Sequence, residues 1–195
     1  MIKKSSVSVF AFVLCLAFSQ PAHALLSVGG HFASFTGAGG TKTGTGLELS
    51  LPLLPLTLGA DILPHTYLSI PPISAIGFAG GSMTGMILPV YASFKFGVPL
   101  FPVSLALEGG YTIGTATSGS STLPIPGGFY YAIDGVYSMP LFPFLNVYAQ
   151  VGYSNLAVDA RQAVSSASNG AVSGSSVPVV DFAGMNYKIG ATIGL

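Results

Sequence analysis

Charged residues are scarce in this 195-residue chain, which has six Lys or Arg and six Asp or Glu. A soluble domain normally carries about 25% charged residues, whereas here the charged share is 6% and half of the residues are hydrophobic. Trp is absent, and the formal charges balance to zero. This composition argues against a domain with a fully hydrated surface. Nucleic-acid binding is also excluded, because it would call for a basic patch.

The amino-terminal 24 residues have the three parts of a secretory signal. Lys3 and Lys4 form a basic start, Val7 to Phe18 is an apolar run, and Ala22-His23-Ala24 is a small-x-small cleavage site. The apolar run is too short to cross a hydrocarbon core of ~30 Å. We therefore expect a cleavable signal peptide over residues 1–24 and export through the Sec pathway.

The mature chain, residues 25–195, then lacks cysteine, because Cys15 lies in the removed segment. This excludes disulfides and thiol catalysis. Loss of two lysines leaves four basic and six acidic residues, a balance of −2.

Glycine (26) and proline (14) are abundant, and the prolines mark a repeat. Three similar tetrapeptides, Pro52–Pro55, Pro99–Pro102 and Pro140–Pro143, are spaced 47 and then 41 residues apart. A unit of that length holds two strands of about 10 residues, one tight turn and one longer loop.

Residues beside these turns alternate between apolar and polar, as in Val103–Ile113, which is the period of a β-strand. We expect eight strands, at Leu26–Phe35, Gly46–Leu51, Leu56–Leu63, Pro89–Phe96, Val103–Ile113, Phe129–Ser138, Leu145–Ser154 and Phe182–Leu195. Short turns would join strands two and three, four and five, and six and seven, and longer loops the others. The predicted fold class is all-β: a closed antiparallel eight-stranded transmembrane β-barrel with short periplasmic turns and long extracellular loops.

Charge placement supports this fold. The six charged residues in the expected strands all fall on the polar face, and they are Glu48, Asp61, Lys95, Glu108, Asp134 and Lys188. A charge facing lipid at mid-bilayer costs about 2–4 kcal/mol, which gives the segregation a physical cause. We predict that these six residues form a charge network inside the barrel.

Within that network Lys95 is expected to be the central cation. Its strand lies between the strand of Asp61 and the strand of Glu108, so Lys95 would bridge the two carboxylates and block the lumen. Lys188 would lie near Gln150.

The last residues, Tyr187–Leu195, alternate strictly and end on an apolar side chain. With strands such as Leu88–Phe96 and Val147–Tyr153, the chain resembles the small outer-membrane barrels of the OmpA-transmembrane-domain, OmpX and OmpW type. The final strand resembles the signature that the barrel-assembly machinery recognises, although Leu195 stands where an aromatic residue is usual.

Two other architectures fit less well. Transmembrane helices over Met86–Leu107 would contain three prolines, each of which breaks helical hydrogen bonds. A secreted soluble barrel would be apolar inside and would carry much more charge outside.

Candidates for catalysis are few. His31 and Ser34 are three residues apart, which in a strand places them on opposite faces. No cluster of metal ligands is evident, so we expect neither an enzyme nor a cofactor.

The second predicted loop, from Pro64 to about Leu88, is unusually apolar. Its candidate binding residues are Tyr67, Leu68, Ile70, Ile73, Ile76 and Phe78. Such a loop could fold over the barrel mouth, lie on lipid or bind a hydrophobic ligand.

Two functions stay open. One is a non-enzymatic outer-membrane barrel with a structural or surface-interaction role, and the other is a narrow conduit for small hydrophobic molecules. Eight strands leave an interior that side chains just fill, which disfavours a wide pore. The expected partners are outer-membrane lipid and lipopolysaccharide, with the assembly machinery during biogenesis, and a monomer is favoured.

Overall fold

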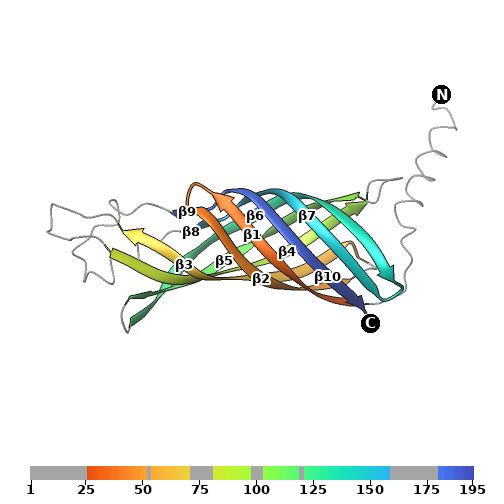
Figure 1. Cartoon of the computed structure of the whole chain (residues 1–195), viewed down its shortest axis with the longest axis horizontal. Coiled ribbons are helices and arrows are strands. Elements are labelled where there is room, and N and C mark those ends of the chain that lie inside the picture. The colour runs from red at the N-terminus through yellow and green to blue at the C-terminus, as the bar shows by residue number, and fades with distance from the viewer. Residues whose placement is uncertain (1–25, 52–53, 71–80, 98–102, 119–120, 159–179) are drawn as a thin grey trace, which may run out of the picture.

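The computed structural model describes residues 26–51, 54–70, 81–97, 103–118, 121–158 and 180–195 (Figure 1). Ten strands occupy these ranges: β1 (Ser27–Gly37), β2 (Gly40–Leu51), β3 (Leu56–Ile70), β4 (Gly81–Gly97), β5 (Val103–Ser118), β6 (Ser121–Phe142), β7 (Leu145–Asn155), β8 (Ala157–Val158), β9 (Val180–Asp181) and β10 (Gly184–Gly194). In these ranges no helix is long and apolar enough to cross a membrane. The predicted signal peptide lies outside them.

Eight of the strands close into one barrel, in the order β1-β10-β7-β6-β5-β4-β3-β2. Every neighbouring pair is antiparallel. The first and last strands complete the ring, because β1 pairs with β10 from Ser27↔Gly194 to Gly37↔Gly184. The predicted fold class, an all-β closed antiparallel eight-stranded barrel, is confirmed. Closure pairs each of the eight strands with two neighbours over the length that they share, which removes exposed sheet edges from that part of the barrel.

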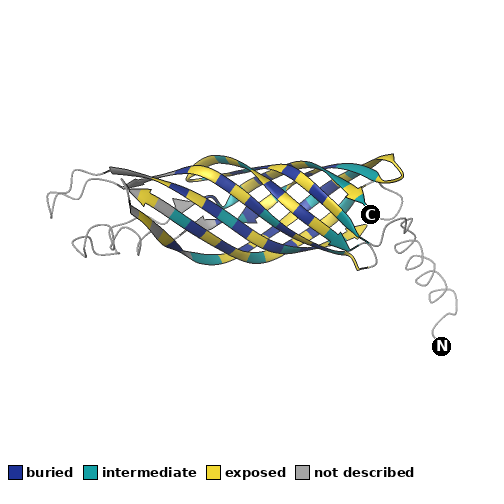
Figure 2. Ribbon diagram, turned by 90° about the horizontal axis from the view of Figure 1, so that it is seen from below, coloured by how far each residue is buried: buried dark blue, intermediate teal, exposed yellow. Residues whose placement is uncertain are grey.

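Burial alternates along each barrel strand, so buried and exposed positions form a checkerboard over the barrel wall (Figure 2). Inward positions are buried and include the charged and most polar side chains together with aromatic and aliphatic ones, whereas outward positions are mostly apolar and exposed. Phe32 on β1 has an exposed fraction of 74%, for example, and Phe129 on β6 one of 84%. Within the described parts of the eight barrel strands, no Asp, Glu, Lys or Arg occupies the outward face.

The two ends of the barrel differ. At the end that we call the turn end, the last strand closes on the start of the first: the Leu195 amide donates to the Leu26 carbonyl at 2.8 Å. At the opposite end, the loop end, strands β3 to β6 are 15 to 22 residues long, whereas β1, β2, β7 and β10 have 11 or 12. Strands β3 to β6 therefore continue past the other four as a projecting sheet (Figure 1).

Several strands are longer than predicted at the loop end. Strand β2 begins at Gly40 rather than Gly46, and β6 begins at Ser121 rather than Phe129. The expected first loop is thereby reduced to Ala38 and Gly39 between paired strands. The sequence pattern gave no sign of this, because Gly40–Gly46 contains only Gly, Thr and Lys. Alternation becomes invisible where both faces of a strand are polar.

Strands β8 and β9 leave the barrel wall and pair only with each other. They continue from β7 and lead into β10, and the Phe182 amide donates to the Leu156 carbonyl at 2.9 Å. Both of these side chains are fully buried. The β8–β9 pair thus places two large apolar side chains in the interior at the loop end.

Candidate functional site: the barrel interior

The interior has two layers. Near mid-height lies what we call the charged layer, formed by His31, Glu48, Asp61, Glu108, Asp134, Gln150 and Lys188. Further along the same strands toward the loop end lies the apolar plug, formed by Phe35, Leu63, Ile87, Ile125, Leu156 and Phe182. Each of these residues is less than a tenth exposed. Side chains thus close the lumen at two levels.

Lys188 on β10 reaches across the lumen. Its Nζ donates to both carboxylate oxygens of Glu108 on β5, at 2.8 and 3.1 Å, and lies 3.5 Å from Oδ2 of Asp61 on β3. The same Nζ lies 3.9 Å from the centroid of the Tyr91 ring on β4. In the ring of strands β4 stands diametrically opposite β10. One side chain therefore spans the barrel, with an exposed fraction of 1%.

The predicted role of Lys95 is wrong. Lys188, and not Lys95, lies between Asp61 and Glu108. The Lys95 side chain is 28% exposed, and its Nζ lies 3.9 Å from Oε2 of Glu48 and 5.1 Å from the centroid of the Tyr148 ring.

Register explains the error. Lys95 on β4 pairs with Ala106 on β5, whereas Glu108 on β5 pairs with Ser93 on β4. Lys95 is therefore nearer to the turn end than the carboxylates it was expected to bridge. Counting strands along the sheet identifies wall neighbours, but a long side chain in a narrow lumen can contact strands three places away.

Glu108 and Asp134 are joined through Gln150. The Gln150 Nε2 donates to Glu108 Oε1 and to Asp134 Oδ2, both at 2.8 Å. The Tyr130 hydroxyl donates to the other oxygen of Glu108 at 2.7 Å. Glu108 thus accepts hydrogen bonds from three strands, which fixes its carboxylate in the middle of the layer.

His31 on β1 contacts Asp61 on β3, with 2.5 Å between Nε2 and Oδ1. Strand β2 runs between them, and there the facing residue is Gly46. A Cβ at Gly46 would lie 2.2 Å from both contacting atoms. Only the absence of a side chain allows the pair to meet. Sequence analysis missed this role, although a glycine on the inward face of a strand is a usable signal for a close approach.

The first part of the predicted apolar loop belongs to a strand. Tyr67, Leu68 and Ile70 belong to β3 and pair with residues 81–84 of β4. The chain enters this extension through an irregularity between Leu63 and Thr66, where His65 adopts a φ of 53°. Ile73, Ile76 and Phe78 lie outside the described residues.

The charged side chains of the interior make ion pairs with one another or, for Asp134, accept a hydrogen bond from Gln150. No group of three or more metal-ligating residues occurs in the described ranges. Ser34 occupies an outward position of β1, on the face opposite His31. The arrangement supports rigid closure by paired charges.

Comparison with known proteins identifies the fold. No protein-family model matches the chain, and no curated protein sequence does. Among solved structures, Neisserial surface protein A (NspA) aligns over 87% of this chain and 96% of its own, with 10% identity and a TM-score of 0.50. Ail, the attachment invasion locus protein of Yersinia pestis, and the outer membrane protein OprG from Pseudomonas aeruginosa each cover 87% of this chain and 95% of their own. Both are 12% identical to it, with TM-scores of 0.44 and 0.45. The resemblance to small outer-membrane barrels that the sequence suggested is confirmed at the level of the fold.

Proposed function

We propose that the mature chain is a bacterial outer-membrane protein without enzymatic activity, which acts as a structural or surface-interaction barrel. The observation that carries this proposal is the closed lumen: Lys188 crosses the barrel and pairs with carboxylates on two distant strands. A barrel filled in this way offers its outer wall and its loop end for function, not its interior.

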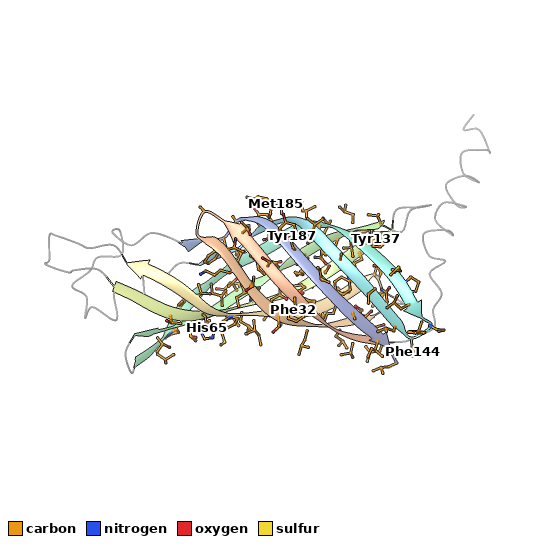
Figure 3. The ribbon with its side chains drawn as sticks, in the orientation of Figure 1. Phe32, His65, Tyr137, Phe144, Met185 and Tyr187 are labelled. Atoms are coloured by element: carbon orange, nitrogen blue, oxygen red, sulfur yellow. The ribbon has the colours of Figure 1, made fainter. Side chains whose placement is uncertain are left out.

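The outer wall supports placement in a membrane. Its exposed apolar side chains occur on all eight barrel strands, and Phe32, Tyr137, Met185 and Tyr187 are labelled examples in Figure 3. Two aromatic pairs also stand on this wall. Phe142 and Phe144 stack at 5.9 Å at the turn end, and Tyr111 and Phe129 meet edge to face at 6.1 Å nearer the loop end. Aromatic girdles of this kind mark the two interfaces of outer-membrane barrels. Lipid and lipopolysaccharide are the expected surroundings, and the assembly machinery is a partner during biogenesis.

The projecting sheet supports a surface role. Beyond the edge-to-face pair, β5 and β6 continue to Ser118↔Ser121. Exposed residues there include Thr117, Thr122 and Pro124, in contrast to the apolar outward positions lower on the same strands. A rigid, largely uncharged sheet standing clear of the membrane would give a partner a preformed docking surface.

The second function inferred from the sequence, a conduit for small hydrophobic molecules, requires a path through the lumen. An apolar solute would have to displace Lys188 from Glu108 and Asp61, leaving buried charges unpaired, which costs several kcal/mol per ion.

Single-channel recording in planar bilayers separates the two functions. We expect no stable conductance from the purified protein and no accelerated uptake of apolar solutes into vesicles. Steady, reproducible channels, or uptake that Lys188→Met increases and Lys95→Met does not, would reject the structural role in favour of the conduit.

A further inference from the structure

The outer wall carries a groove on one side of the barrel. It has a volume of about 350 Å³ and is lined by residues of β5, β6, β7 and β10. Its two smallest lining residues, Gly135 on β6 and Ala149 on β7, occupy outward positions. Gly135 pairs with Val151 and Ala149 pairs with Tyr137, so each small residue stands beside a larger one on the neighbouring strand. The groove is therefore a hollow that two small residues leave in an otherwise apolar wall.

The groove extends from the turn end toward mid-height. Val103 in its lining is the first residue of β5, directly after the connection from β4 at the turn end. Tyr187, also in its lining, directly precedes Lys188 of the charged layer, which lies near mid-height. Figure 3 shows Tyr137 and Tyr187 at different levels along the barrel, with Tyr137 nearer to Phe144 at the turn end. The hollow thus follows the direction of the barrel axis between these two levels.

This depth matches one leaflet of a membrane. The apolar band of an outer-membrane barrel is about 25 Å tall, so its rim and its mid-height delimit the hydrocarbon of one leaflet. Acyl chains in a leaflet lie along the membrane normal, which is also the direction of the groove. None of the residues that line the groove is charged, so a lipid headgroup would find no ionic partner in it.

A hollow in a lipid-facing wall favours whatever molecule fills it. Atoms beside an unfilled void lose their dispersion contacts on that side. Because lipid chains are as apolar as the wall, fit and not hydrophobicity decides which neighbour stays. A second copy of the chain would have to bury about 1,200 Å² or more to form a stable interface, which extends well beyond the groove. One acyl chain needs the groove alone.

We propose that the groove binds one acyl chain of a phospholipid from the leaflet at the turn end, with the headgroup at the rim near Val103 and Tyr137. This inference rests on the proposed placement in an outer membrane. Tyrosine is suited to such a rim, because its ring is apolar and its hydroxyl forms hydrogen bonds. The lipid in the groove exchanges more slowly than the lipids around the rest of the wall, because it makes more contacts.

The test is native mass spectrometry of the mature barrel, after folding into vesicles of one phospholipid and extraction with a mild detergent. We expect a monomer that keeps one phospholipid. Gly135→Leu fills the groove and should lower the fraction of barrels that carry a lipid by about tenfold. Ala149→Leu fills the same groove from β7 and should act in the same direction.

Gly109→Leu is the matched control, because Gly109 is an outward glycine of the wall that does not line the groove. Both glycine positions have room for a side chain. A Cβ meets nothing within 4 Å at Gly109, and at Gly135 it meets the Val151 carbonyl oxygen at 3.8 Å. Lipid retention in Gly109→Leu should equal that of the wild type.

Gel migration of boiled and unboiled samples first establishes that each protein has folded. A wild type that does not fold into vesicles would reject the membrane placement, and the lipid site with it. A folded wild type that keeps no phospholipid, or equal retention in the Gly135 and Gly109 variants, would overturn the lipid site alone. If Gly135→Leu does not fold, Ala149→Leu decides. A dimer that either groove variant dissociates would assign the groove to a second copy of the chain.

Discussion

At the scale of single residues, Lys188 organises the described interior because it contacts two carboxylates on different strands. Its ammonium is shared by Glu108 and Asp61 and lies against the Tyr91 ring. Removing one partner from a buried ionic group is far more damaging than replacing the whole group, because the remaining charges stay buried without compensation.

We therefore expect Lys188→Met to destabilise the barrel by about 3–5 kcal/mol. In a domain of this size that corresponds to a fall in melting temperature of roughly 10 °C, measured by circular dichroism in detergent. Adding Glu108→Gln should restore part of the loss. Lys95→Met is the matched control and should cost much less, because Lys95 is partly exposed and 3.9 Å from its acid. Equal losses in the two lysine variants would contradict the assignment.

A second residue prediction concerns Gly46, which lets His31 meet Asp61 across β2. Gly46→Ala places a methyl group against both contacting atoms, and overpacking of this kind costs about 1–3 kcal/mol. Gly109→Ala serves as the control, since a Cβ there meets nothing within 4 Å. Urea unfolding in micelles should show a loss for the first variant and almost none for the second. Similar stabilities would show that the His31–Asp61 contact tolerates displacement.

At the scale of elements, each long strand crosses from one environment to another. Leu107 and Thr117 both point outward from β5, but Leu107 lies within the apolar wall and Thr117 in the projecting sheet. If lipid surrounds only the wall, a charge should be tolerated at Thr117 and not at Leu107.

We expect Leu107→Arg to cost about 2–4 kcal/mol in lipid vesicles and Thr117→Arg about 0–1 kcal/mol. The measurement is the free energy of folding into vesicles from denaturant. A comparable penalty at both positions would mean that β5 is embedded along its whole length, and the projecting sheet would then not be a surface for external partners.

At the scale of the whole molecule, closure explains why the fold should persist in detergent. All eight wall strands pair on both sides outside the projecting sheet, so the closed wall has no free edge from which unfolding can begin. We expect the folded protein to resist sodium dodecyl sulfate at room temperature.

Unboiled and boiled samples should consequently migrate differently on a detergent gel. In a producing bacterium the protein should co-fractionate with lipopolysaccharide, and intact mass should place the mature amino terminus at Leu25, as signal cleavage after Ala24 requires. Recovery in the soluble fraction, or identical migration with and without boiling, would contradict membrane placement.

The sequence by itself determined the architecture. Alternation in segments such as Val103–Ile113, together with the recurring proline turns, was enough to predict eight strands and a closed barrel. Charge segregation predicted which face points inward, because burial in lipid penalises a charge wherever the strand lies. These are local properties, and each can be derived from neighbouring residues alone.

Only the tertiary structure decided which charges meet. Lys188 contacts Glu108 and Asp61 over sequence separations of 80 and 127 residues, through the lumen and not along the wall. The height of each residue depends on the register of every strand between them, and the pairing of Lys95 with Ala106 places it nearer to the turn end than Asp61 and Glu108. The extension of β2 to Gly40 was equally hidden, because Thr and Gly suit both faces of a strand above the apolar wall. Patterns in sequence report the environment of one residue, whereas contacts across a lumen depend on the geometry of the closed ring.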